Sequence, residues 1–94
     1  MKAELLQRDR FDFDDGTFVE IVIWRLPTPV PGSSHRYKYR LFYGAPGKRF
    51  VGYDNERWKS DHRHAEGREE PYRFKDVETL VRDFFADVER RRSK

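Results

Sequence analysis

The sequence of 94 residues contains no cysteine and no long hydrophobic run. The absence of cysteine excludes disulfides, cysteine-ligated zinc, iron–sulfur clusters and a thiol nucleophile. No stretch approaches the ~20 apolar residues that a membrane-spanning helix needs, and the first residues lack the apolar core of a signal peptide. We therefore expect a cytoplasmic protein with no membrane partner.

Apolar residues are also scarce: they make up 36% of the chain, whereas charged residues make up 39%. Such a balance is typical of disordered segments, but disordered chains are poor in aromatic residues. Here two Trp, five Tyr and eight Phe make up 16% of the sequence. These rings are enough for a small core, so we expect one folded domain that spans residues 1–94.

Charge is distributed unevenly along the chain. The 20 basic and 17 acidic residues give a formal net charge of +3. Residues 35–53 hold basic side chains and no acidic one, whereas residues 54–75 mix both signs with two of the three histidines. The first composition suits contact with phosphates, and the second suits proton transfer.

Alternating apolar residues and β-branched residues are typical of strands. They predict strands in four segments: 5–13, 17–25, 35–43 and 48–53. Asp-Gly at 15–16 and Pro-Gly at 46–47 predict tight turns, and the proline-rich segment 26–34 predicts a crossing loop. On the third strand, Tyr37, Tyr39 and Tyr43 share a face with Leu41 and are expected in the core.

The C-terminal segment has helical periodicity. Its apolar residues recur at the spacing of one helix face: Val77, Leu80, Val81, Phe84, Phe85 and Val88. Asp76 is the expected N-cap, and the basic residues 90–92 suit the negative end of the helix dipole. The sequence thus predicts an α+β fold, in which a four-stranded antiparallel sheet is followed by a C-terminal amphipathic helix packed on one face. Residues 54–75 are left as a long connection, which is more often functional than idle.

This connection carries the candidate acid–base residues: Asp54, Glu56, Asp61, His62 and His64. In metal-free RNA cleavage, a base takes the proton of the 2′-hydroxyl, an acid protonates the leaving 5′-oxygen, and cations offset charge on the phosphorane. His62 and His64 could act as base and acid, with Asp61 or Asp54 orienting a ring. The alternative is that both histidines only satisfy local hydrogen bonds.

Basic residues that could contact phosphates precede and enter the same segment: Arg36, Lys38, Arg40, Lys48, Arg49, Arg57 and Lys59. The alternative is a solvated outer face. A metal site built on His62 and His64 would need a third ligand from Asp54, Glu56 or His35, and no standard ligand spacing is present. We therefore expect no metal and no cofactor.

Four blocks carry a resemblance to a known family: residues 39–41, 51–56, 61–64 and 68–74. These blocks resemble the TumE family of prokaryotic toxin–antitoxin proteins, and the resemblance covers essentially the whole chain. The Tyr-Asp-Asn-Glu and Asp-His-x-His blocks are its most specific part. The resemblance implies a growth-inhibiting toxin. It also implies a cognate helix-turn-helix antitoxin, encoded beside the toxin, that neutralises it.

The function expected from residues and resemblance together is a toxin that acts on RNA as a metal-independent endoribonuclease. The alternative is a non-catalytic module that binds nucleic acid or protein through its charged loop. Because strand edges of a small sheet invite pairing between chains, a homodimer is a further expectation.

Overall fold

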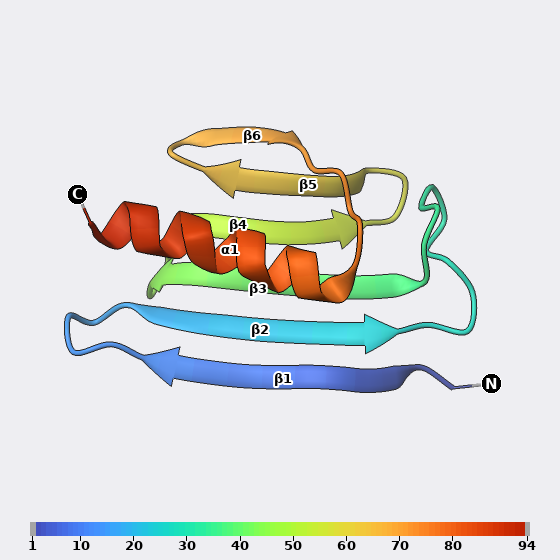
Figure 1. The fold of residues 1–94 in the computed structure, drawn as a ribbon, viewed down its shortest axis with the longest axis horizontal. Coiled ribbons are helices and arrows are strands. Elements are labelled where there is room, and N and C mark those ends of the chain that lie inside the picture. Colours follow the sequence, from blue (N-terminus) through green and yellow to red (C-terminus); the bar gives the residue numbers. More distant parts are fainter. Residues whose placement is uncertain (1, 94) are drawn as a thin grey trace.

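The computed structural model, which describes residues 2–93, contains a six-stranded antiparallel sheet and one helix (Figure 1). The strands lie side by side in sequence order, so each pairs with the next along the chain. They are β1 (Glu4–Asp12), β2 (Phe18–Arg25), β3 (Tyr37–Ala45), β4 (Lys48–Glu56), β5 (Ser60–Ala65) and β6 (Arg68–Pro71), and the helix is α1 (Val77–Arg92).

The predicted α+β class, antiparallel sheet and C-terminal helix are confirmed, but the prediction of four strands was wrong. Residues 54–75 are not a long loop, because they complete β4 and then form β5 and β6. The turn between β5 and β6 has positive φ at both Glu66 (54°) and Gly67 (74°). The turn has the sequence Glu-Gly instead of the usual Asn-Gly or Asp-Gly, and glutamate seldom adopts this backbone conformation. The sequence therefore carries no signal for a tight turn here.

Helix α1 packs on one face of the sheet, over β3 and β4 in Figure 1. The Asp76 side chain accepts a hydrogen bond from the Thr79 backbone N–H at 2.7 Å, which confirms the predicted N-cap. The predicted core position is confirmed for Tyr39, which is 1% exposed, and for Tyr43, which is 3% exposed, but Tyr37 is only half-buried and lies outside the core. The core comprises Val19, Ile21, Ile23, Tyr39, Leu41, Tyr43, Val51, Tyr53, Leu80, Phe84 and Val88. No helix in residues 2–93 is long and apolar enough to cross a membrane.

An ion-pair network ties the helix to the sheet. The Nε of Arg63 on β5 lies 2.6 Å from the buried carboxylate of Asp87, and the Tyr53 hydroxyl donates to that carboxylate at 2.5 Å. Burial alone would raise the pKa of Asp87, but the hydrogen bonds from Arg63 and Tyr53 outweigh it and hold the pKa below its ordinary value. Glu70 of β6 pairs with another nitrogen of Arg63. The network therefore joins β4, β5, β6 and α1.

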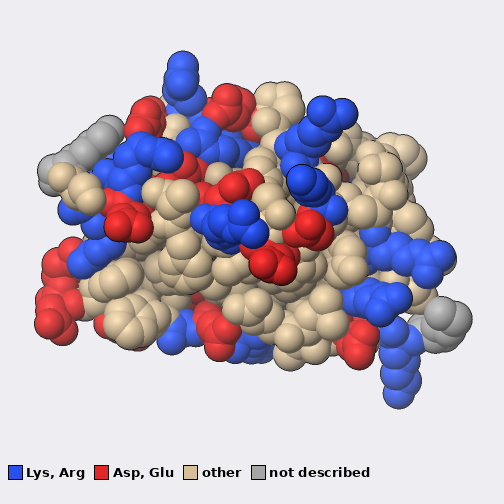
Figure 2. All heavy atoms as spheres, in the orientation of Figure 1, with Lys and Arg blue, Asp and Glu red and all other residues tan. Residues whose placement is uncertain are grey.

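The two faces of the sheet differ. The helix side, seen in Figure 2, shows basic and acidic side chains interspersed. We call the opposite side the open face, because none of residues 2–93 forms a helix over it. Strand alternation sends the following side chains to the open face: Lys38, Arg40, Asp54, Glu56, His62 and His64. Most of the acid–base candidates therefore share one side of the sheet with part of the basic stripe.

Candidate acid–base site on the open face

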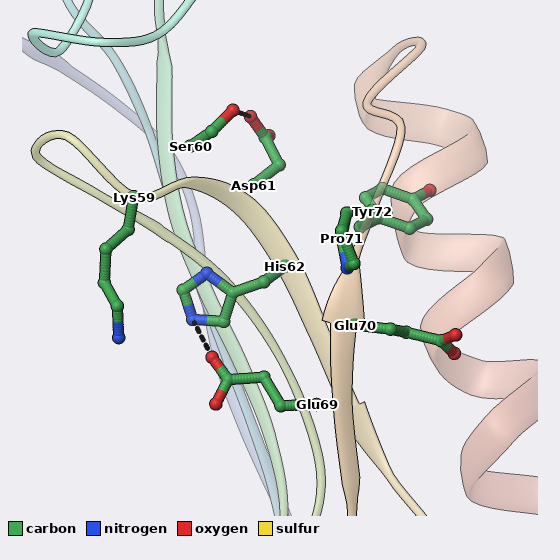
Figure 3. Close-up of a pocket in the computed structure, with 8 residues that line it drawn as sticks. All are labelled: Lys59, Ser60, Asp61, His62, Glu69, Glu70, Pro71 and Tyr72. Carbon is green, nitrogen blue, oxygen red and sulfur yellow. Dashed lines mark hydrogen bonds and ion pairs between the residues drawn. The ribbon is translucent and has the colours of Figure 1, made fainter.

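His62 is flanked by two carboxylates from neighbouring strands. Its Nε2 lies 2.5 Å from Oδ1 of Asp54, its cross-strand partner on β4, and 3.5 Å from Oε1 of Glu69 on β6 (Figure 3). The His62 side chain is only 11% exposed and that of Asp54 is 17% exposed. Because Nε2 serves the carboxylates, Nδ1 is the ring nitrogen left to exchange a proton with a substrate.

A row of directly paired residues crosses the open face at this point. Val22 pairs with Arg40, Arg40 with Asp54, and Asp54 with His62. All members of the row except His62 line a hollow of about 340 Å³, whose full lining is Val22, Trp24, Lys38, Tyr39, Arg40, Asp54 and Glu56. The apolar floor made by Val22 and Trp24 lies on β2, the cations follow on β3, and the carboxylates on β4 lie next to the histidine.

Glu56 adds a second carboxylate to the hollow. One ligand atom each from Asp54, Glu56 and His62 lie within 4.8 Å of one another, so these three residues could hold a divalent ion. Neither His64 nor His35, both considered as metal ligands from the sequence, belongs to this group. No ion pair within residues 2–93 engages Glu56, which leaves its oxygens free to accept hydrogen bonds.

His64 follows His62 on the open face, two residues further along β5. Its Nδ1 is buried and has no hydrogen-bond partner in the described structure. We assign the ring proton to Nε2, because this tautomer leaves a lone pair rather than an N–H group at the unpaired position. The cross-strand neighbour of His64 is Gly52, and a Cβ there would come 2.7 Å from Cδ of Arg49. Because Gly52 has no side chain, the side chain of Arg49 can lie over β4, next to the strand β5 that carries His64.

Asp61, predicted as part of the same acid–base set, points to the other side of the sheet. Its Oδ2 accepts a hydrogen bond from the Tyr39 hydroxyl at 2.6 Å and lies 2.7 Å from Nε2 of His35. The His35 ring in turn stacks on Phe74 with centroids 4.0 Å apart. Burial and then the bond to Asp61 raise the pKa of Tyr39 well above its ordinary value, so this hydroxyl stays protonated. Asp61 therefore orients His35, not His62 or His64.

The predicted phosphate-contacting residues are divided among several places. Lys38 and Arg40 line the hollow beside Asp54, and Arg40, Lys48 and Arg49 line a second hollow of about 490 Å³. Lys59 lies on the same side as His62 and Glu69 in Figure 3, whereas Glu70 and Tyr72 point toward α1. Arg57 lies in the turn between β4 and β5.

Arg36 lies elsewhere, in a hollow of about 190 Å³ beside Lys2 and Arg25. None of the seven predicted phosphate-contacting residues forms an ion pair with a carboxylate of residues 2–93. By contrast, several other arginines do: Arg10, Arg63, Arg82, Arg90 and Arg92. No carboxylate of residues 2–93 therefore neutralises the candidate cations, although Lys38 donates to the Asn55 carbonyl. Two others lie over aromatic rings, Arg40 over Phe42 and Lys48 over Phe50.

Sequence reasoning missed three residues of this site: Val22, Trp24 and Glu69. Val22 and Trp24 form a second apolar face of β2, opposite the buried Ile21 and Ile23. In the structure they are half-buried and form the floor of the hollow. Glu69 could not be found without β6, because only the pairing of β5 with β6 brings it to His62.

Comparison with known proteins gives one match. A family model described as Toxin TumE matches residues 2–92, which is nearly the whole chain. No curated protein and no solved structure shows a significant match.

Proposed function

Because this chain belongs to the TumE toxin family, we propose that it is the toxin of a toxin–antitoxin pair and that it cleaves RNA without a metal ion. The observation that carries the ribonuclease proposal is the His62–Asp54 pair, 2.5 Å apart. Its cross-strand neighbour on the open face is Arg40, a cation without an ion pair in residues 2–93. A proton acceptor and a phosphate-binding group are therefore adjacent.

In the proposed reaction, Nδ1 of His62 takes the proton of a ribose 2′-hydroxyl. Asp54 accepts the Nε2–H of the same ring, which fixes its orientation and stabilises the imidazolium that forms. The 2′-oxygen then bonds to phosphorus and the bond from phosphorus to the 5′-oxygen breaks. Solvent water supplies the proton that the 5′-oxygen takes up.

The remaining groups of the face have electrostatic roles in this proposal. Arg40 and Lys38 offset the charge that builds up on the phosphorane. The Nε2–H of His64 donates a hydrogen bond to a non-bridging oxygen rather than transferring a proton, because a second ring proton would lie at its buried, unpaired Nδ1. Arg49 provides a further cation beside the same strand.

A toxin family implies an antitoxin partner in general. We propose that this partner is a helix-turn-helix protein encoded next to the toxin, and that the toxin meets its RNA substrate in the cytoplasm. A homodimer through a strand edge is a further proposal. The edge strand β1 supports it, since its side chains are nearly all exposed along nine residues.

The test is cleavage of a fluorescent single-stranded RNA by the purified protein in the presence of EDTA. Loss of a general base typically lowers the rate 10²–10⁴-fold, so we expect His62→Gln to be at least about 100-fold slower. Asp54→Asn should show a smaller but clear loss, of about 10-fold or more, because the ring loses its anionic partner. Both variants should also lose growth inhibition in cells.

His35→Gln is the matched control, because His35 is also bonded to an aspartate but lies on the helix side. We expect it to lower the melting temperature and to keep the cleavage rate of the folded protein. Equal activity of His62→Gln and the wild type would refute the proposal. So would a complete loss of cleavage on addition of EDTA, since it would show that the reaction needs a metal.

The same experiment separates the alternative, a binding module without catalysis. That function requires the open-face cations but not the imidazole. It predicts that His62→Gln remains fully toxic, whereas charge reversal at Lys38 and Arg40 abolishes toxicity. In this alternative the binding surface lies on the strands β5 and β6, because these strands take the place of the expected charged loop.

A further inference from the structure

The hollow beside His62 has the chemistry of a nucleobase site. It combines an apolar floor, made by Val22 and Trp24, with two cations and two carboxylates in about 340 Å³. This volume lies at the low end of ordinary ligand sites, which span about 300–1,000 Å³. An aromatic floor favours a planar ring, and the nearby cations favour the phosphate attached to it.

The two carboxylates of the hollow are not equivalent. Asp54 is occupied by Nε2 of His62 at 2.5 Å. Glu56 has no ion pair within residues 2–93, yet its carboxylate lies within 4.8 Å of the Asp54 and His62 ligand atoms. The hollow therefore presents one free acceptor group, with two oxygens, next to the proposed base.

Among the four RNA bases, guanine alone has two adjacent N–H donors on its Watson–Crick edge, at N1 and N2. A carboxylate can accept both at once, whereas adenine and cytosine offer an acceptor nitrogen there and uracil offers a single N–H. We propose that this hollow binds guanine, with Glu56 reading its Watson–Crick edge and Trp24 stacking on its ring. The inference rests on the proposed ribonuclease function and names its substrate: single-stranded RNA cleaved after guanosine.

We expect cleavage after guanosine because Asp54 belongs both to the hollow and to the pair with His62. This residue lines the hollow and also holds His62. A nucleotide whose base occupies the hollow therefore brings its own ribose, with the 2′-hydroxyl that attacks, nearest to Nδ1 of His62. Arg40, which is paired in register with Asp54, lies beside the phosphate that follows.

The test uses DNA oligonucleotides that contain a single ribonucleotide, either guanosine, inosine, adenosine, cytidine or uridine. Inosine lacks the N2 amino group, so it keeps one of the two hydrogen bonds. We expect guanosine to be cleaved about 10- to 100-fold faster than adenosine, with inosine between them. Glu56→Gln should remove most of this preference, because its amide nitrogen is a donor that faces another donor.

Glu20→Gln is the matched control, since Glu20 is another glutamate of the sheet that lines the second hollow instead. It should keep the wild-type preference for guanosine. Equal cleavage after guanosine and adenosine by the wild type would overturn the inference while leaving the ribonuclease proposal intact. A Glu56→Gln variant that is slower on all five substrates by the same factor would also overturn it.

A binding measurement separates this inference from the proposed function. In a Trp58→Phe background, Trp24 is the only tryptophan, and its fluorescence reports on the hollow. We expect guanosine monophosphate to quench it at about 10-fold lower concentration than adenosine monophosphate, and Glu56→Gln to abolish the difference. If this holds while no oligonucleotide is cleaved, the ribonuclease proposal fails and guanine binding stands. If neither nucleotide quenches selectively, the guanine site is refuted.

Discussion

At the scale of single residues, Asp87 is the clearest stabilising group. Its side chain is 6% exposed and receives hydrogen bonds from Arg63, Tyr53 and Arg90. Asp87→Asn would leave the guanidinium of Arg63 without its buried anion, with only the more exposed carboxylate of Glu70 to pair with. We expect a loss of about 3–5 kcal/mol in the free energy of unfolding, measured by urea denaturation at pH 7. Asp83→Asn, which only replaces the charged acceptor of the Tyr72 hydroxyl by a neutral one, should cost about 1 kcal/mol.

The pH dependence of this difference has a defined sign. The pKa of Asp87 is lowered in the folded protein, so its stabilising effect is fully present above the unfolded pKa of about 3.9. The effect is lost as the pH falls through the folded value. The gap in stability between the wild type and Asp87→Asn should therefore shrink from pH 5 toward pH 2. A gap that stays constant over this range would contradict the assignment.

The candidate site was partly accessible from the sequence at this same scale. His62, Asp54 and Glu56 were predicted as one set, and the structure brings their ligand atoms within 4.8 Å. Asp61 was assigned to the set because it is adjacent to His62 in the chain. In a strand, however, adjacent residues point to opposite faces, so Asp61 contacts Tyr39 and His35 instead. Sequence distance is a poor guide to contact unless the strand is recognised.

At the scale of elements, the hairpin of β5 and β6 is what the sequence did not reveal. Both strands are dominated by charged and polar residues, because one side carries the candidate acid–base residues and the other carries Arg63 and its partners. Neither side has the apolar alternation on which strand prediction depends. Strands β2, β3 and β4 were found because Ile21, Tyr39, Leu41 and Tyr53 point into the core.

The turn of this hairpin can be tested directly. Gly67 has a φ of 74°, which costs a residue with a Cβ about 1–2 kcal/mol. We expect Gly67→Ala to lower the free energy of unfolding by this amount and to speed hydrogen exchange in β6. Gly67→Asn should cost clearly less, since asparagine tolerates the left-handed region. Equal costs for Ala and Asn would show that the turn does not have this conformation.

At the scale of the whole molecule, the net charge of +3 understates how the cations are arranged. On the helix side, Arg63, Arg90 and Arg92 are held by carboxylates. On and beside the open face, the basic residues 38, 40, 48 and 49 form no ion pair with residues 2–93. An approaching polyanion therefore meets four basic side chains on this side of the sheet that no carboxylate of residues 2–93 pairs with, although the overall charge is small.

This arrangement predicts that the salt dependence of RNA binding arises from the cations of the open face. Binding of single-stranded RNA should weaken with salt at a slope of about −0.7 per phosphate contact in a plot of log K against log salt concentration. In a His62→Gln background, which prevents cleavage, the double variant Arg40→Gln/Arg49→Gln should reduce the slope by about 1.4, as measured by fluorescence anisotropy. Arg91→Gln is the matched control, because Arg91 lies on α1 over the ring of Phe50 and also lacks an ion pair. Arg91→Gln should leave the slope unchanged. If it reduces the slope as much as one open-face substitution does, the slope depends on the number of cations and not on their position. RNA binding to the open face would then be refuted.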